Sequence, residues 1–486
     1  MQNIIKNVSY LSGAAIIVKI LGAISAFLIA KYLEPANYGV WISLLLIYAY
    51  SGLFTFGVLE SLMKLYPFYY GSKDRINANA VEENSFVVIL LGSITLTLSG
   101  LIFTYFISDN TLKLYVTMMT VTSSIGLISS YNYYRMAAHQ FFQAVSILES
   151  MRAMGMILIV VPFTYMWSLN GAVRGAIINE SLLCMMSLYW NNKKWGKVRI
   201  HSNITNVIKL IKIGMPITLF WWTFILQGSI DRILSIRFLG PSETGIYGLG
   251  VSIQSLIIML PAAIGRVISP KINEKAGAGS SSDELMKLVI LPARVISVFV
   301  PQMIGVIYLS IPIIYCSLLP KYASGMLAGQ ILVFGAYFIA MIRIGTNYLV
   351  AVDKQNKLYK YILLCLICNI TLNMLLINYG FGITGLALGS SLSAFLLTTT
   401  IWLEVYKLMG MAIHAQIKEL FILYLPFILS SVILFIINNV KYVKGDMNTM
   451  VLLVNIAIYI LLFNITVFHL SAFKTIIIGN YTLRHN

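Results

Sequence analysis

The sequence contains few charged residues. Only 10% of its 486 residues are Asp, Glu, Lys or Arg, whereas 59% are hydrophobic. The mean hydropathy of +0.84 is far above that of a soluble domain. A helical span needs roughly 20 mostly apolar residues, so the chain can hold about a dozen spans joined by short connections. A sizeable soluble domain is excluded, and the function is expected to reside within the membrane.

Acidic residues are especially scarce. The chain has 17 of them against 34 lysines and arginines, which gives a formal net charge of +17. In a soluble protein this excess would suggest nucleic acid as a partner. In a polytopic chain, basic residues instead mark cytoplasmic connections and attract membrane lipids. No nucleic-acid partner is expected.

Cysteine and histidine are also rare, with four and five residues. The cysteines all lie in apolar runs, where Cys behaves as a small hydrophobe. Cys365 and Cys368 form a CxxC sequence without nearby metal ligands, which favours packing. The histidines are scattered without metal-ligand spacing. We therefore expect no metal, no cofactor and no catalytic residue, and the chain is not expected to be an enzyme.

Apolar runs separated by turn signals predict fourteen membrane spans. The first is expected to be an uncleaved span, because the run is too long for a signal peptide. The predicted spans cover residues 8–32, 40–66, 84–108, 112–138, 146–167, 172–190, 210–238, 244–268, 288–316, 325–351, 358–378, 384–404, 420–438 and 450–470.

Basic residues collect on alternate connections. They follow the sixth span at Lys193, Lys194, Lys197 and Arg199, and the tenth span at Lys354, Lys357 and Lys360. The positive-inside rule makes those connections cytoplasmic. With an even number of spans, both termini are then predicted to be cytoplasmic.

One short stretch occurs twice. Lys31–Val40 (KYLEPANYGV) reappears as Arg237–Ile246 (RFLGPSETGI). Both copies contain a basic residue, an aromatic residue, Leu, Pro four residues after the basic residue, and Gly four residues after Pro. Pro ends one helix and Gly permits the tight turn into the next. The duplication predicts parallel repeats around a central cleft.

The predicted organisation is all-α and polytopic. Residues 1–200 form an N-terminal six-helix lobe and residues 201–410 a C-terminal six-helix lobe. Residues 411–486 add two transmembrane helices and a cytoplasmic tail. The fold class is thus about 14 transmembrane helices, with two lobes around the cleft.

Lys19 lies near the centre of the first span. Gly22, Ala26 and Ala30 share its face at spacings of three or four residues. A charge at the bilayer centre is costly unless it faces protein or a water-filled cavity. Lys19 is therefore a candidate for binding an anion in the cleft. The alternative is a buried ion pair with Glu60 or Glu180.

Three further cations lie within predicted spans. Arg343 has no acidic residue one turn away, and its planar guanidinium suits phosphate. Arg232 follows Asp231 directly, and either residue can pair across helices or contact substrate. Arg152 can pair with Glu149 three residues earlier, which is the favoured interpretation.

Other candidates are less specific. Glu60 and Glu180 can carry a coupling proton or pair with Lys19. Trp221 and Trp222 lie mid-span, where packing between helices is favoured over stacking on a sugar ring. Arg135 and Arg294 lie near span ends, where their side chains can extend to the headgroups.

The duplicated turn carries a family resemblance. Arg237–Gly245, preceded by Asp231-Arg232-Ile233-Leu234, resembles the seventh-helix region of the polysaccharide transporters of the MOP superfamily, which include the Wzx-type O-antigen flippases. Leu33–Gly39 resembles the matching element after their first helix. The resemblance extends over essentially the whole chain and implies a MATE-like fold.

The resemblance also implies a function. Such proteins move an undecaprenyl-diphosphate-linked oligosaccharide from the cytoplasmic to the periplasmic leaflet of the bacterial inner membrane. The expected partners are this substrate, membrane lipids, and a polysaccharide polymerase with its chain-length regulator. The driving force would be a proton or sodium gradient.

Several alternatives remain at this stage. MATE transporters export mostly cationic compounds, which suits the basic candidates here less well. The lipid II flippase family relies on several first-lobe arginines, whereas this first lobe offers Lys19 and Arg152. A membrane glycosyltransferase or polysaccharide polymerase would need larger extracytoplasmic loops. The sugar composition is not encoded in any motif of the sequence.

Overall fold

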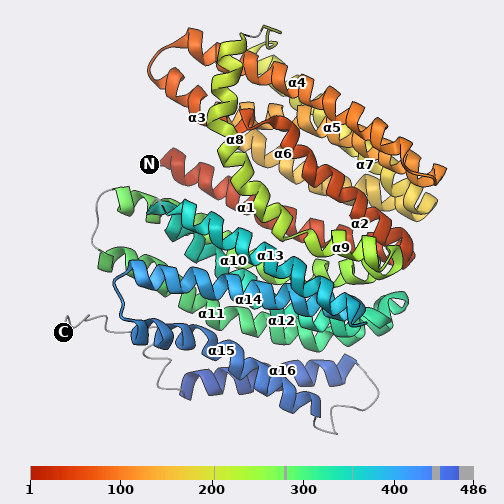
Figure 1. Ribbon diagram of the computed structural model, residues 1–486, viewed down its shortest axis with the longest axis vertical. Helices are drawn as coiled ribbons and strands as arrows, with labels where there is room; N and C mark the ends of the chain where they lie inside the picture. Colours follow the sequence, from red (N-terminus) through yellow and green to blue (C-terminus); the bar gives the residue numbers. More distant parts are fainter. Residues whose placement is uncertain (1, 202, 278–281, 353, 440–448, 470–486) are drawn as a thin grey trace. The chain divides into compact units, whose positions relative to one another are not determined.

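The computed structural model describes residues 2–201, 203–277, 282–352, 354–439 and 449–469. All regular elements in these ranges are helical (Figure 1). The predicted C-terminal tail lies outside the described residues. The helices are α1 (Gln2–Tyr32), α2 (Pro35–Tyr50), η1 (Ser51–Thr55), α3 (Val58–Gly71), α4 (Arg75–Tyr105), α5 (Asn110–Ala138), α6 (Phe142–Gly155), η2 (Met156–Val160), α7 (Val161–Trp195), α8 (Ile204–Gln227), α9 (Ile230–Phe238), α10 (Pro241–Gly277), α11 (Ser282–Pro312), η3 (Ile313–Leu318), η4 (Pro320–Gly325), α12 (Met326–Ala351), α13 (Gln355–Asn378), α14 (Gly382–Leu408), α15 (Ile413–Asn439) and α16 (Thr449–His469).

The helices confirm a polytopic membrane protein. Eleven helical stretches in the described part of the chain are long and apolar enough to cross a membrane. One of them, Phe142–Trp195, contains two predicted spans, because its backbone leaves helical geometry at Trp167 and Ser168. The long helices α1 and α10 coincide with the first and eighth predicted spans. The fourteen spans thus correspond to helices of the structure.

Two spans are broken within their length. The second consists of α2, η1 and α3, and Phe56 and Gly57 between them have positive φ values of 48° and 79°. Positive φ is strained for a bulky residue such as Phe. The seventh consists of α8 and α9, separated at Gly228 and Ser229. The sequence predicts one continuous span at each place, and the structure corrects both to two helical segments.

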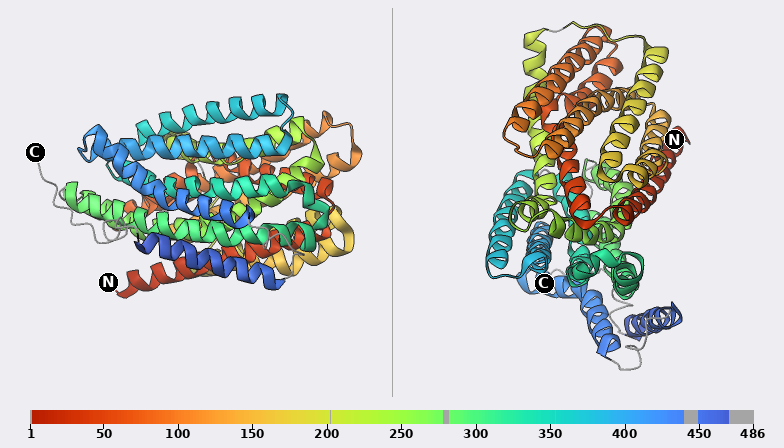
Figure 2. Two further views of the ribbon diagram at one scale, coloured as in Figure 1. Left: turned by 90° about the horizontal axis from the view of Figure 1, so that it is seen from below. Right: turned by 90° about the vertical axis from the view of Figure 1, so that its right-hand side faces the viewer.

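The chain divides into two compact units, residues 1–245 and 246–486. Within each unit the long helices run roughly alongside one another (Figures 1 and 2). The predicted boundary near residue 200 follows the internal repeat rather than compactness, and it stays a prediction.

In the first unit, the two copies of the duplicated turn touch. A Cβ on Gly39 would collide with the carbonyl oxygen of Pro241, and a Cβ on Gly245 would collide with that of Pro35. In both cases it would also lie 2.8 Å from the amide nitrogen of the other glycine. The contact is therefore reciprocal, and each copy supplies the same residue to it.

In the second unit, α12 packs on both α14 and α11. The last two helices, α15 and α16, both pack on α11. Tyr459 of α16 donates a hydrogen bond to the carbonyl oxygen of Pro301 at 2.7 Å, and its ring covers Gly305. These contacts make the additional helices an integral part of this unit.

Candidate functional site

Small residues bring α6 and α7 close together in the first unit. A Cβ on Gly155 would collide with the side chain of Asn179, and one on Gly175 would lie 2.9 Å from the Cα of Val160. The Asn179 amide donates to the carbonyl oxygen of Arg152 at 3.3 Å. This close approach places the side chain of Arg152 opposite that of Glu180.

Arg152 and Glu180 form an ion pair inside the helical bundle. Arg152 Nη2 lies 3.0 Å from Glu180 Oε1. The hydroxyl of Tyr48, on α2, donates to Glu180 Oε2 at 3.3 Å. The Glu180 side chain is only 6% exposed, whereas that of Arg152 is 42% exposed. The carboxylate is thus satisfied by two partners, while part of the Arg152 side chain stays accessible.

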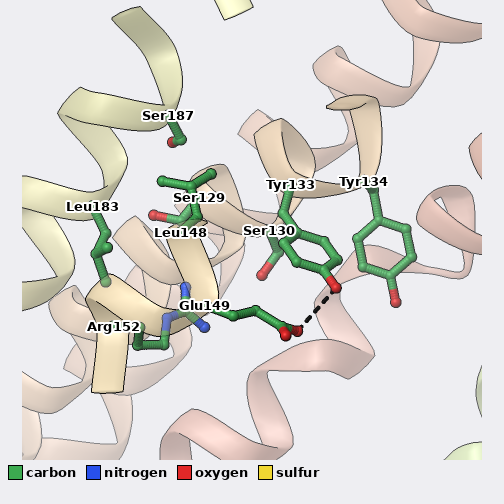
Figure 3. A pocket seen from close by; sticks show the side chains of 9 residues that line it. All are labelled: Ser129, Ser130, Tyr133, Tyr134, Leu148, Glu149, Arg152, Leu183 and Ser187. Carbon is green, nitrogen blue, oxygen red and sulfur yellow. Dashed lines mark hydrogen bonds between the residues drawn. The ribbon is translucent and has the colours of Figure 1, made fainter. Parts of the chain in front are cut away.

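The Arg152 side chain lines a cavity of about 250 Å³ (Figure 3). Glu149 also lines it and accepts a hydrogen bond from Tyr133 at 3.0 Å. Hydroxyl groups supply most of the remaining polar lining, at Ser129, Ser130, Tyr134 and Ser187.

This arrangement corrects the expected pairing of Glu149 with Arg152. The spacing of three residues places them on one helix face. Arg152 instead pairs with the buried carboxylate of Glu180 on α7, and Glu149 accepts a hydrogen bond from the phenol of Tyr133 on α5. The pairing of Glu180 with Lys19 is excluded in this structure too. Lys19 is exposed, and none of the ion pairs among the described residues includes it.

The cavity contains an anion-binding group beside a carboxylate. A guanidinium can donate several hydrogen bonds to one anion, and such bonds strengthen where water is scarce. Glu149 lines the same cavity, where Tyr133 donates to it. The Arg152 side chain can therefore donate to an anionic oxygen in this cavity.

The remaining predicted residues do not line this cavity. Glu60 lies in the first turn of α3, directly after the break in the second span, and its Oε2 is buried without a hydrogen-bond partner in the described part of the chain. Arg343 belongs to α12 of the second unit, where its side chain lies against Gly265.

Asp231 and Arg232 lie on α9, directly after the second break. Asp231 Oδ1 accepts the backbone N–H of Arg232 at 2.9 Å. Arg232 Nη2 donates to the carbonyl oxygen of Gly228 at 3.2 Å. Both side chains thus help to shape the break, since they satisfy backbone groups there.

The two tryptophans have different environments. The Trp222 ring packs on Tyr50, with 4.8 Å between ring centroids, as expected for packing between helices. Trp221 is 49% exposed. The Tyr50 hydroxyl is also hydrogen-bonded to Ser229, so the end of α2 contacts the start of α9. The breaks in the second and seventh spans are therefore neighbours.

Several interhelical ion pairs were not predicted from the sequence. Arg135 is buried and its Nε lies 3.1 Å from Glu82 Oε2, and His139 bonds the other oxygen of Glu82. Arg294 is buried and pairs with Glu419 at 2.6 Å. The expected extension of these two arginines to the headgroups is wrong, because a carboxylate on another helix is nearer.

No metal centre is found in the part of the chain that the structure describes. Within it, no group of three or more His, Cys, Asp or Glu side chains is placed to hold a metal ion.

Comparisons with known proteins support a transport fold. Residues 4–275, more than half of the chain, match the family described as polysaccharide biosynthesis protein. Two uncharacterized membrane proteins of Methanocaldococcus jannaschii are each 26% identical, over 212 and 207 residues. These matches cover 43% and 42% of this chain and 48% and 40% of the relatives. The chain thus spans less than half the length of the curated relatives that it matches.

Solved structures resemble the chain over a greater length. The lipid II flippase MurJ, in an inward closed conformation, is similar with a TM-score of 0.75 at 15% identity, covering 96% of this chain and 99% of that one. A multidrug resistance MATE family transporter of the MOP superfamily, in an inward-facing conformation, gives a TM-score of 0.64 at 13% identity, covering 83% and 99%. At such identities the likeness shows the fold, and it is the fold of the MOP superfamily.

Proposed function

Because the chain belongs to the polysaccharide biosynthesis protein family, we propose that it is a flippase for an undecaprenyl-diphosphate-linked oligosaccharide. It would move the repeat unit from the cytoplasmic to the periplasmic leaflet of a bacterial inner membrane. Family membership is the observation that carries this proposal, since it connects the chain with polysaccharide synthesis. The fold, which resembles that of a flippase and that of a multidrug transporter, supports transport rather than bond formation.

The charges within the membrane support an anionic substrate. The Arg152 side chain is 42% exposed although that of its partner Glu180 is buried. Lys19 is exposed on α1. A diphosphate can accept paired hydrogen bonds from an arginine and is also attracted to the point charge of a lysine. A transporter for cationic compounds would instead need accessible carboxylates.

Each residue then has a role in an alternating-access cycle. Lys19, Arg152, Arg232 and Arg343 would hold the diphosphate in a hydrated cleft, while the polyprenyl tail stays in lipid. Trp221 would stack on a sugar ring. The headgroup would thus avoid crossing hydrocarbon, where unsatisfied polar groups are costly.

Coupling to an ion gradient would use a carboxylate. Glu60 is the best-placed candidate, because one of its oxygens is buried without a hydrogen bond in the described part of the chain. Glu149, Glu180 and Asp231 each accept a hydrogen bond instead.

A leaflet-resolved assay tests the proposal. The purified protein is reconstituted in liposomes with a fluorescent undecaprenyl-diphosphate oligosaccharide, and the outer leaflet is sampled with a membrane-impermeant quencher. We expect Lys19→Ala and Arg343→Ala to abolish flipping at normal protein levels, with Lys197→Ala as an exposed control. A glycosidic product without translocation, or full flipping in both variants, would overturn the proposal.

A second candidate is transport of lipid II, which the 96% coverage by the MurJ structure favours. The same liposomes distinguish the two candidates if lipid II replaces the oligosaccharide substrate. Faster flipping of lipid II would reverse the assignment.

A further inference from the structure

A second, larger cavity lies at the start of α6 and the end of α7. Its volume is about 480 Å³, within the usual range of about 300–1,000 Å³ for ligand pockets. The positive-inside rule predicts this end of both helices to be cytoplasmic. The lining is mainly apolar and aromatic, and consists of Phe141, Gln143, Ala144, Ile147, Trp190, Lys193 and Lys194.

Two lysines at this cavity have no acidic partner. Both are exposed, and none of the ion pairs within the described ranges includes them. Lys194 Nζ lies 3.2 Å from the centroid of the Phe141 ring, and Lys193 Nζ lies 5.7 Å from that of Tyr189. Contact with an aromatic face holds an ammonium group while leaving its N–H donors available. The cavity therefore has two cations placed at its rim.

Exposed apolar stripes continue from the cavity along both helices. The α6 stripe begins at Ile147, which lines the cavity, and the α7 stripe ends one turn before Lys193. Their members recur at spacings of three and four, which places each set on one helix face. The stripes are Ile147, Met151 and Met154 on α6 with Leu158 on η2, and Ile178, Leu182, Met185 and Tyr189 on α7.

We propose that this cavity binds one anionic phospholipid of the cytoplasmic leaflet. The phosphate would lie on Lys193 and Lys194, the glycerol region against Trp190, and the acyl chains along the two stripes. Trp suits the interfacial position because its ring is amphipathic. Two cations without carboxylates match an anionic headgroup, and two apolar stripes match two acyl chains.

A phospholipid fits better than the substrate of the proposed function. The wall contributes one amide, that of Gln143, and otherwise apolar or basic side chains. It therefore offers few groups for a sugar, and a polyprenyl tail is a single chain. The lipid site does not rest on the proposed function, because its occupancy is measured without transport.

The experiment is native mass spectrometry of the full chain released from nanodiscs of phosphatidylcholine and phosphatidylglycerol in equal amounts. We expect the wild type to retain one phosphatidylglycerol. The double variant Lys193→Ala/Lys194→Ala should bind it about 25-fold more weakly, since each basic residue near an anionic lipid contributes about fivefold. Gln143→Trp, which fills the cavity and keeps both charges, should also lose the lipid.

The matched control is Lys197→Ala/Arg199→Ala, which removes two exposed charges from the following connection and none from the cavity. Retention in the control together with loss in the other two variants supports the site. Equal loss in the control would show a general surface attraction, and unchanged retention in either cavity variant would show that the lipid binds elsewhere. Displacement of the lipid by undecaprenyl diphosphate at equal concentration would identify a substrate site instead. Each of these last three results overturns the proposal.

Discussion

The two units each contain a glutamate that is bonded to one cation and one tyrosine. In the first unit, Glu180 pairs with Arg152 at 3.0 Å and accepts from Tyr48 at 3.3 Å. In the second, Glu404 pairs with Lys357 at 2.6 Å and accepts from Tyr361 at 2.9 Å. Burial is similar too, with the carboxylates 6% and 8% exposed and the cations 42% and 45% exposed.

Their positions along the helices differ. Arg152 is the eleventh residue of α6 and the seventh residue of the predicted fifth span, about two turns inside that span. Lys357 lies in the first turn of α13 and Glu404 near the end of α14. Only Arg152 lines a cavity among those described above. Similar local chemistry is therefore compatible with two roles: ligand contact in the first unit and anchoring of helix ends in the second.

The largest effect is expected from Arg152→Ala. It leaves Glu180 buried with Tyr48 alone, and breaking a buried pair costs roughly 3–5 kcal/mol, with the lower end expected because Arg152 is partly exposed. Flipping should fall about a hundredfold if the guanidinium contributes 2–3 kcal/mol to headgroup binding. The free energy of unfolding and liposome flipping measure the two effects.

Adding Glu180→Gln to Arg152→Ala separates stability from transport. The neutral amide needs no counter-ion, so the double variant should regain most of the lost stability and none of the lost flipping. Recovery of flipping in the double variant would make the pair structural, and the contrast between the units would disappear.

A smaller effect is expected from Lys357→Ala. Glu404 keeps its bond from Tyr361, and a partly exposed pair contributes little, so we expect a loss of about 1–2 kcal/mol in unfolding free energy. Flipping should stay at the wild-type level in the same liposomes. A large loss of flipping at normal stability would assign the second pair a transport role.

Conservative exchanges, lysine for Arg152 and arginine for Lys357, test the same difference between the two pairs. Arg152→Lys keeps the charge and loses the planar fork, so flipping should fall about tenfold, as for one charge-assisted hydrogen bond of about 1.5 kcal/mol. Lys357→Arg should change neither flipping nor stability measurably. Equal responses to the two exchanges would contradict the proposed difference.

The smallest effect concerns Asp74, an exposed carboxylate outside the spans that caps α4. A hydrogen bond from the Asn77 side chain, together with the Asn77 backbone N–H, lowers the pKa of Asp74 below its usual value. Its contribution to stability is therefore complete above the usual pKa of about 4 and is lost as the pH falls through the lowered value. Asp74→Ala should be slightly less stable than wild type at neutral pH, and the difference should vanish in acid. A constant difference would mean that the carboxylate charge is not involved.

Much of the fold was predictable because it depends on local composition. Spans of about 20 apolar residues, bounded by Pro, Gly or basic residues, coincide with the helices from α1 to α16. The breaks at Phe56 and Gly228 were missed, because the predicted spans 40–66 and 210–238 run through Gly57 and through the polar stretch Gln227–Arg232. Gly57 closely approaches Gly214 of α8, so the first break depends on a contact distant in sequence.

The candidate site was predictable only in part. Arg152, Glu149 and Glu180 were candidates because they are charged residues within predicted spans. Such charges are costly in the membrane unless they are paired or face a cavity. Their partners could not be read from spacing, which describes one helix at a time. Tyr48 and Tyr133 were missed because a tyrosine in an apolar span is ordinary.

The reciprocal contact of Gly39 and Gly245 has a consequence for the order of assembly. Chains are synthesised from the N-terminus, and early segments generally fold first. The surface around Gly39 cannot be covered until Gly245 has been made. The contact between the two copies of the duplicated turn can therefore form only after Gly245 has been synthesised. By then about half of the chain has been made.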